Sequence, residues 1–372
     1  MIAIANYDFR ASGTVAKSIE IAIALQNAGV PVELWVVRAQ GPLRDRVPQG
    51  LPVIETGSGL RLRWRAVDLI ANIVGLAVAI RRRRPSLFLC GGNHLLLPSR
   101  ISSWLSGRRR QMLCGARASN SSQRAGRSRQ AIHREIRLKF GSRDFVVAVS
   151  QELADELQAA RLKCRIAVIP NGVDLDRIDR LAAAPCDHPY FQQPGGPVLA
   201  AMGRITHQKG FDTIIDALAL LPVETGARLI IIGAGTHREV RTLYKQAARL
   251  GVADRVSFAG YRDNPFAFLA RCDLFVSGSR WEGASNALIE ALACGLPLAV
   301  TDCPTGNREV VLRGPYGTLA EIDDAASLAA AITTELDKRR PRSGQSAGAR
   351  HWAIEHCLAQ WVATLRQERP LA

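Results

Sequence analysis

The stretch Ser279–Val311 reads SRWEGASNALIEALACGLPLAVTDCPTGNREVV and combines a glycine-bearing loop, a short apolar helix and a strand. We expect the helix to end at Gly295, because glycine commonly follows a last helical turn and Pro297 prevents its continuation. Leu298–Thr301 is then typical of a buried strand. A loop, a helix and a strand in this order indicate one unit of an α/β domain.

Two glutamates in this stretch indicate a binding site. Glu290 lies in the otherwise apolar segment Leu288–Cys294, where an unpaired charge would be costly. Its partner is either a protein donor, as in a buried salt bridge, or the hydroxyl of a ligand. Glu282 lies in the loop that precedes the helix. Carboxylates accept hydrogen bonds from adjacent hydroxyls, so the two residues suit a ribose and a sugar. The first backbone N–H groups of the helix suit an anion such as phosphate.

A second loop carries two cations. The segment Gly203–Gly210, GRITHQKG, follows a predicted strand at Val198–Met202 and precedes a predicted helix. Arginine binds phosphate oxygens in pairs, whereas lysine acts as a point charge. Arg204 and Lys209 beside a helix N-terminus therefore predict a pyrophosphate site, although two surface charges would give the same pattern.

Strands and helices alternate along the whole chain, which predicts an α/β fold of two doubly wound domains. The first unit comprises the strand Ile2–Asn6, a loop with Gly13 and a helix to Asn27. That loop lacks the G-x-G-x-x-G pattern, so Gly13 is either a close approach to a phosphate or only a turn. We expect a basic N-terminal domain over 1–175, a second domain over 195–350 and a C-terminal helix over 351–372.

The charge of the chain is concentrated in its first part. Residues 1–150 contain 24 Lys and Arg against 8 Asp and Glu, whereas residues 151–372 contain 25 of each kind. This asymmetry is typical of a face that meets a membrane surface, nucleic acid or a phosphorylated substrate. Solubility together with the arginine usage of a high-GC genome would give the same asymmetry. Arg61–Arg84, RLRWRAVDLIANIVGLAVAIRRRR, is too short and too polar to span a bilayer. It fits both a helix in the membrane interface and an ordinary packed helix with a basic end.

The remaining signals concern location and the ends of strands. Eight cysteines without a C-x-x-C pair, and an N-terminus unlike a signal peptide, are typical of reduced thiols in a cytoplasmic protein. The loops with His94 and with Arg117–Asn120 follow predicted strands, where ligands bind in open α/β sheets. His94 is a candidate base or acceptor contact, or a structural histidine. Asp174-Leu175-Asp176 matches a metal-binding D-x-D pattern, but we predict no metal there.

Several motifs in the expected order resemble one enzyme family. S-R-W-E-G-x-S-N-x-L-I-E-A-L-A-C-G-L-P is similar to the E-x7-E signature of retaining GT-B glycosyltransferases, those of glycosyltransferase family 4 or glycosyl transferases group 1. The phosphate loop G-R-I-T-H-Q-K-G-F-D and the segments I-P-N-G-V-D, V-S-F-A-G-Y-R and T-D-C-P-T-G-N-R-E-V also match. The first loop departs from the family, with Ser12-Gly13 where many members have two glycines.

The resemblance implies two Rossmann-like domains with a UDP- or GDP-linked sugar donor in the cleft between them. Arg204 and Lys209 would bind the diphosphate, Glu290 the ribose and Glu282 the sugar; Glu282, Arg204 and Lys209 are the expected catalytic group. The last helix would cross back onto the first domain. No cofactor or metal is expected. The further donor contacts that the resemblance implies are Gly13, Gly260, Arg262, Gly283, Asn286, Ala287 and Leu288.

The function that the resemblance implies is retaining transfer of a sugar to a glycan or lipid-linked acceptor, in lipopolysaccharide or exopolysaccharide synthesis. The candidate acceptor residues are His94, Arg117 and Asn120. The arginine-rich half suits a lipid-linked acceptor at the cytoplasmic leaflet, with peripheral attachment and no nucleic acid. The alternatives are a GT-B sugar synthase or epimerase with a soluble acceptor and a non-catalytic basic membrane-surface protein.

Overall fold

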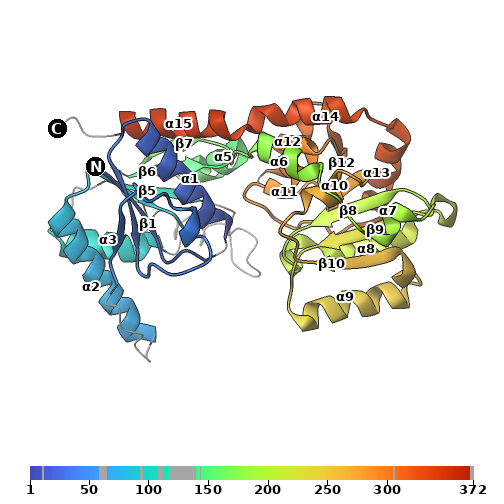
Figure 1. Cartoon of the computed structure of the whole chain (residues 1–372), viewed down its shortest axis with the longest axis horizontal. Coiled ribbons are helices and arrows are strands. Elements are labelled where there is room, and N and C mark those ends of the chain that lie inside the picture. Colours follow the sequence, from blue (N-terminus) through green and yellow to red (C-terminus); the bar gives the residue numbers. More distant parts are fainter. Residues whose placement is uncertain are drawn as a thin grey trace. The chain divides into compact units, whose positions relative to one another are not determined.

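The computed structural model describes residues 1–10, 12–57, 65–92, 95–107, 112–117, 137, 140–142, 144–304 and 306–368. The chain forms two compact units (Figure 1). The first comprises 1–149, 153–170 and 355–372, and the second comprises 150–152 and 171–354. The chain therefore returns to its first unit after it has completed the second.

The first unit is built on a parallel sheet of seven described strands, in the order β3-β2-β1-β4-β5-β6-β7. The inner strand IAIAN is buried over its whole length, because a parallel sheet is covered on both faces. The strands are β1 (Ile2–Asn6), β2 (Val32–Val36), β3 (Val53–Glu55), β4 (Leu87–Cys90), β5 (Met112–Arg117), β6 (Phe145–Ala148) and β7 (Arg165–Val168).

Helices from both ends of the chain complete this unit. Ser12 caps the first helix by accepting a hydrogen bond from the N–H of Val15 at 3.3 Å. Trp361 and Leu365 of the last helix are buried in the same core as the first strand. The described helices are α1 (Gly13–Asn27), the 3₁₀ turn Arg44–Arg46, α2 (Arg65–Arg83), α3 (Leu96–Leu105), α5 (Gln151–Ala159) and α15 (Ile354–Gln367).

The second unit repeats the architecture with a parallel sheet of six described strands, in the order β10-β9-β8-β11-β12-β13. Its strands are β8 (Val198–Met202), β9 (Arg228–Ile232), β10 (Val256–Gly260), β11 (Leu274–Ser277), β12 (Leu298–Thr301) and β13 (Gly317–Ala320). The central pair β8 and β11 is the point where the strand order reverses. In open α/β sheets, ligands bind at the carboxyl ends of strands near such a point.

The helices of the second unit precede, connect and follow its strands along the chain. They are α6 (Leu175–Ala182), α7 (Pro189–Gln192), α8 (Phe211–Leu220), α9 (His237–Arg249), α10 (Phe266–Leu269), α11 (Asn286–Ala293), α12 (Asn307–Leu312), α13 (Ala325–Lys338) and α14 (Arg342–Ala349). Short 3₁₀ turns lie at His207–Lys209, Val223–Thr225, Ala253–Arg255 and Arg350–Trp352. The expected helix end is confirmed, since α11 ends at Ala293 and Gly295 has a φ of +81°.

Two expectations about local structure are wrong. The sequence pattern of 343–349 predicts a polar linker, but these residues belong to α14, where Gln345 and Ala349 are buried. The segment from Arg177 to Pro197 lacks a clear period and predicts a domain boundary, but the second unit resumes at Asn171, and the segment contains most of α6 and all of α7. The hydrophobic core of the second unit includes Ile178 of α6, so packing rather than local pattern stabilises this helix. No helix in the described part of the chain is long and apolar enough to cross a membrane.

Candidate functional site

The candidate site lies at the carboxyl edge of the second sheet, where the backbone is packed too closely for side chains. The N–H of Gly203 donates to the carbonyl of Ile232 at 3.0 Å, and the N–H of Gly233 donates to the carbonyl of Gly260 at 2.9 Å. A Cβ on Gly233 would lie 1.8 Å from the carbonyl oxygen of Gly203. Glycines therefore bring the ends of three neighbouring strands together, and they leave peptide groups rather than side chains at this edge.

Lys209 and Glu282 meet at this edge. The Lys209 Nζ lies 2.6 Å from the Glu282 Oε1, and the Ser279 Oγ donates to the same oxygen at 2.7 Å. Glu282 is only 5% exposed, so its charge requires these donors. The structure thus brings together two residues that lie 73 positions apart and that sequence analysis assigns to opposite parts of one ligand.

Arg280 is a buried cation that sequence analysis misses. Its guanidinium forms a paired contact with Asp212 of α8, at 3.0 Å and 2.7 Å, and its Nε lies 2.6 Å from Asp323. It also donates to the carbonyl of His207 at 2.6 Å. Burial raises the pKa of Asp212, but the bond to Arg280 outweighs this effect and holds that pKa below its ordinary value. Arg280 therefore ties the loop of Lys209 to the loop of Glu282.

Glu290 has a different environment from Glu282. It lies on α11 and is partly buried, and no described group makes a hydrogen bond or ion pair with its carboxylate. Burial raises its pKa to about 7, although the charges of Arg177 and Lys209 act in the opposite direction. A buried salt bridge of Glu290 is absent among the described residues, so the carboxylate remains available to a ligand hydroxyl.

This environment predicts a pH-dependent cost in stability. Because the folded-state pKa of Glu290 is about 7 and its ordinary value is 4.5, stability falls as pH rises through that window. Glutamine cannot ionise. We therefore expect urea titration above pH 7 to give Glu290→Gln a free energy of unfolding roughly 3 kcal/mol higher than that of the wild type, and we expect the two to match near pH 4.5. Glu224→Gln, at an exposed position, is the control. This account would be contradicted if the difference in free energy of unfolding between the wild type and Glu290→Gln stayed constant from pH 5 to pH 8.

The start of α11 offers backbone donors. Ser285 is its N-cap residue, but the Ser285 side chain makes no capping hydrogen bond. The side-chain oxygen of Asn286, the first residue of the helix, accepts a hydrogen bond from the side-chain amide of Asn171 at 3.0 Å. The first N–H groups of a helix carry partial positive charge, so this helix start suits a phosphate or another anion. The predicted residues Gly283, Ala287 and Leu288 lie in this loop and the first turn of α11.

The other predicted donor residues lie in several places. Arg204 is exposed in the loop after β8, and no described side chain pairs with its guanidinium. Gly260 ends β10 with a φ of +71°. Arg262 is exposed, with its guanidinium 5.4 Å from the centre of the Phe268 ring. Gly13 is the first residue of α1, in the first unit.

Most of the candidate acceptor residues lie outside the described residues. Arg117 is the last residue of β5, while His94 and Asn120 lie outside the described residues. Asp174 of the D-x-D match caps α6, since its carboxylate accepts a hydrogen bond from the N–H of Arg177 at 2.8 Å. Within the described ranges, no three His, Cys, Asp or Glu side chains are grouped to hold a metal ion.

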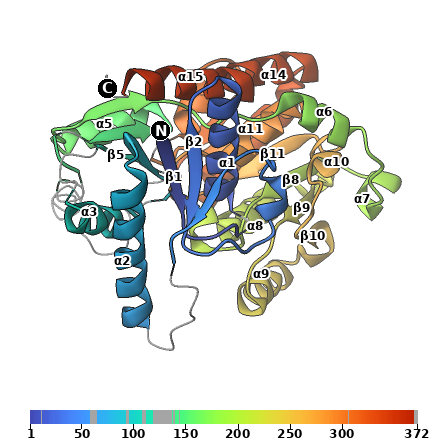
Figure 2. The same cartoon turned by 60° about the vertical axis from the view of Figure 1, so that its left-hand side comes forward.

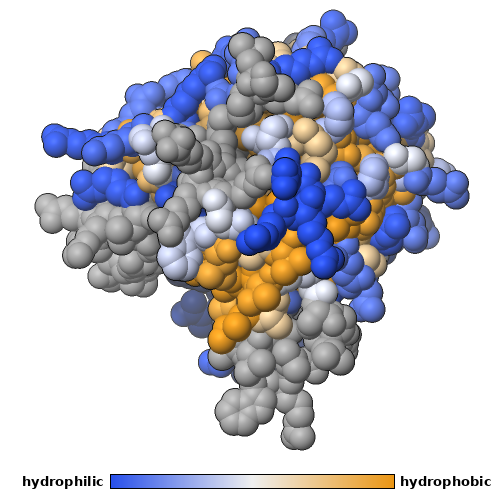
Figure 3. All heavy atoms as spheres, turned by 90° about the vertical axis from the view of Figure 1, so that its left-hand side faces the viewer, coloured by the Kyte–Doolittle hydropathy of each residue, from blue (hydrophilic) through white to orange (hydrophobic). Residues whose placement is uncertain are grey.

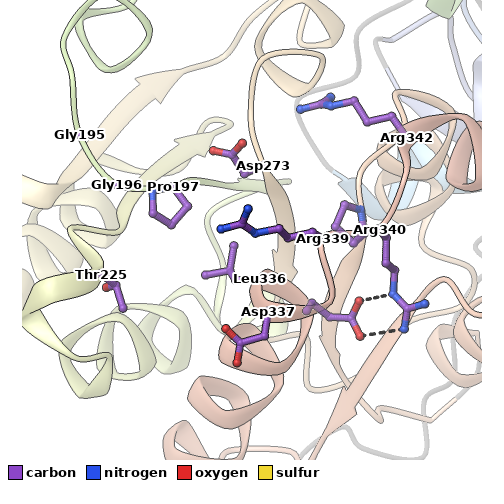
Figure 4. A pocket seen from close by; sticks show the side chains of 12 residues that line it. Gly195, Gly196, Pro197, Thr225, Asp273, Leu336, Asp337, Arg339, Arg340 and Arg342 are labelled. Atoms are coloured by element: carbon purple, nitrogen blue, oxygen red, sulfur yellow. Dashed lines mark hydrogen bonds and ion pairs between the residues drawn. The ribbon is translucent and has the colours of Figure 1, made fainter.

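A pocket of about 890 Å³ lies at the opposite edge of the second sheet, before strands β8, β11 and β12 (Figure 4). Two of its carboxylates and Arg340 already have protein partners. The buried Glu335 pairs with Arg340 at 2.5 Å and with Lys338 at 3.0 Å, and Asp273 accepts from the N–H of Val198 at 2.8 Å. These contacts hold the ends of the strands in place, so we assign the pocket no ligand.

Known proteins resemble both halves of the chain. The model for Glycosyltransferase Family 4 matches residues 13–177, and the model for Glycosyl transferases group 1 matches residues 196–338. Among solved structures, Anabaena Alr3699/HepE in complex with UDP and glucose aligns with a TM-score of 0.76 and 21% identity, over 98% of this chain and 99% of that one. The predicted GT-B fold class, with two Rossmann-like α/β domains, is confirmed.

Curated relatives align over part of the chain. The lipopolysaccharide core biosynthesis glycosyltransferase LpsE of Rhizobium meliloti is 35% identical over 193 residues, which is 52% of this chain and 54% of the relative. A Campylobacter jejuni N-acetylgalactosaminyltransferase, named for an acceptor with a diphospho-undecaprenol group, is 30% identical over 52% of this chain and 49% of its own. The chain thus spans about half the length of these relatives. Because the two family models together cover most of its length, the chain belongs to the family 4, or group 1, glycosyltransferases.

Proposed function

We propose that this chain transfers a sugar from a nucleotide-sugar donor to a lipid-linked or lipopolysaccharide acceptor, with retention of the anomeric configuration. The observation that carries the proposal is the grouping of Lys209, Glu282 and the uncapped start of α11 at one sheet edge. Cations and backbone donors there suit a diphosphate, and the adjacent carboxylates suit hydroxyl groups.

The proposed chemistry uses this grouping to stabilise the leaving diphosphate. Negative charge develops on the diphosphate as the bond to the sugar breaks, and Lys209 and Arg204 oppose that charge. Glu282 holds the sugar hydroxyls, and Glu290 holds the ribose. The acceptor hydroxyl attacks from the face that the diphosphate leaves, and the departing phosphate takes its proton. The side chains and helix start supply the charge compensation, so the proposal includes neither a metal nor a cofactor.

The relatives support the substrate classes. The Anabaena structure contains UDP and glucose, which favours a UDP-linked hexose as the first donor to test. The Rhizobium and Campylobacter relatives carry lipopolysaccharide core and undecaprenol-linked names, which favours a lipid-linked acceptor. The alternative is a synthase with a soluble acceptor, and it differs from the main proposal only in the acceptor.

The donor site is tested by calorimetric titration with UDP-glucose, UDP-N-acetylglucosamine and GDP-mannose, with free UDP and GDP as references. Hydrogen bonds to charged groups contribute about 1.5–3 kcal/mol, so we expect Glu290→Ala to weaken binding of the preferred donor about 10- to 100-fold. Free UDP and GDP contain the same ribose, so we expect Glu290→Ala to weaken their binding as well. Glu224→Ala, exposed in the same unit, is the matched control. An unchanged affinity of Glu290→Ala for every donor would remove Glu290 from the site.

A further inference from the structure

The exposed large apolar side chains of the first unit gather on two adjacent helices. Among the described residues, fourteen large hydrophobic side chains are exposed, and eight of them lie on α2 and α3. The other six are scattered over the second unit. We define the α2–α3 face by these eight residues: Leu69, Ile70, Val74, Val78, Leu97, Ile101, Trp104 and Leu105. Their concentration distinguishes this face from the single exposed hydrophobic residues that occur on every protein.

Helical spacing makes this face continuous. Ile70, Val74 and Val78 recur every four residues and so lie on one side of α2. Leu97, Ile101 and Leu105 recur in the same way on α3. The two helices lie side by side (Figure 2) and are joined by a hydrogen bond from the Ser102 Oγ to the carbonyl of Ile73, at 2.9 Å. Figure 3 shows an apolar area bordered by hydrophilic side chains on this side of the molecule.

The third helix has its polarity reversed relative to a helix that faces water. Ser99 and Ser102 are completely buried, while Leu97 is 55% and Trp104 is 57% exposed. The buried hydroxyls are satisfied inside the protein, since Ser102 donates to backbone carbonyls and Ser99 contacts the Cys90 thiol at 3.5 Å. A helix that hides serines and exposes leucine, isoleucine and tryptophan matches an apolar medium better than water.

Basic residues continue this face at one end. Arg81 lies on the same side of α2 as Ile70, Val74 and Val78, three residues beyond the last of them. Arg81, Arg82 and Arg84 are exposed. Residues 1–150 carry three times as many basic as acidic residues, so few carboxylates of this unit offset the charge. An apolar face with arginines and tryptophan at its borders is the composition of helices that lie in a membrane interface.

We propose that the α2–α3 face docks on an anionic lipid membrane, with its apolar side chains among the acyl chains and Arg81 and Arg82 at the headgroups. The charge decides between a membrane and a second copy of the chain. A second copy would offer Arg81 and Arg82 a unit with three times as many basic as acidic residues, whereas an anionic surface compensates their charge. The proposal is independent of the donor site, because the α2–α3 face lies in the first unit.

The test is sedimentation of the full chain with vesicles of phosphatidylcholine alone, or with three parts in ten phosphatidylglycerol. We expect binding to the anionic vesicles only, reduced at least tenfold by 0.5 M NaCl. Val74→Glu with Ile101→Glu, and separately Arg81→Glu with Arg82→Glu, should each lower the partition coefficient at least tenfold. All four positions are exposed, and circular dichroism checks that the variants fold.

Matched controls distinguish an effect of the α2–α3 face from a general effect of added negative charge or lost hydrophobicity. Val223→Glu with Leu312→Glu changes exposed apolar residues of the second unit, and Arg241→Glu with Lys245→Glu changes exposed cations of α9. Both controls should bind vesicles as the wild type does. Equal losses in controls and test variants would overturn the proposal. The proposal would also fail if the wild type did not bind the vesicles but formed a dimer in sedimentation velocity, and if Val74→Glu with Ile101→Glu abolished that dimer.

Discussion

Lys209→Ala is expected to lower kcat by about 100- to 1000-fold, the usual cost of removing one preorganised donor at a developing negative charge. The substitution also leaves the buried Glu282 without its cation, which lies 2.6 Å away in the wild type. Breaking a buried ion pair from one side destabilises a protein by roughly 3–5 kcal/mol. The measurement is therefore turnover of the preferred donor at a temperature well below the melting point of the variant.

A double variant separates the two effects. Lys209→Met with Glu282→Gln removes both charges and keeps similar volumes, so we expect most of the lost stability to return while turnover stays low. Lys245→Ala on α9 is the control for loss of an exposed lysine. If the double variant recovered turnover together with stability, Lys209 would have a structural role only.

Gly210→Ala is expected to destabilise the second unit by roughly 3 kcal/mol or more, through backbone strain together with a steric clash. Gly210 has a φ of +58°, and an added Cβ would lie 1.9 Å from the carbonyl oxygen of Gly278. The added Cβ and the Gly278 carbonyl are both fixed to the backbone. The clash can therefore be relieved only if the loop that positions Lys209 moves. We expect thermal unfolding of the full chain to show the loss, with donor binding weakened at temperatures where the variant is still folded.

Gly251 provides the matched control for this prediction. It has a φ of +70°, and an added Cβ would meet no atom within 4 Å. Gly251→Ala therefore measures the cost of the left-handed conformation alone, expected at about 1 kcal/mol. The difference between the two variants reports the clash with Gly278. Equal losses of stability in Gly210→Ala and Gly251→Ala would show that the loop moves away from the clash without an energetic cost.

Local signals in the sequence predict much of the second unit. The apolar run of β8, the helix end at Gly295 and the strand Leu298–Thr301 follow from short-range patterns, which is why they are confirmed. The grouping of Lys209 with Glu282 was predicted only from a family resemblance. Loop, strand and helix patterns place both residues at one sheet edge, but they do not predict an ion pair between the two side chains.

Long-range packing accounts for what the sequence did not reveal. Arg280 and Asp212 lie 68 positions apart, and no local pattern links them. The α14 segment RSGQSAGA has few apolar residues and resembles a linker, but it packs against α11, and Arg342 donates to the carbonyl of Ala270 at 3.0 Å. The exposed apolar side chains of α3 are likewise not predicted from the sequence, because hydrophobic patterns are interpreted on the assumption that apolar side chains are buried.

The last helix affects how the chain reaches this structure during synthesis. Trp361 and Leu365 of α15 are part of the core around β1, yet they are translated after every residue of the second unit. While the ribosome makes residues 171–354, the first sheet has no last helix to cover it. The second unit is almost continuous in sequence and buries its own core as it emerges. The half of the molecule that is made first is therefore the half that is finished last.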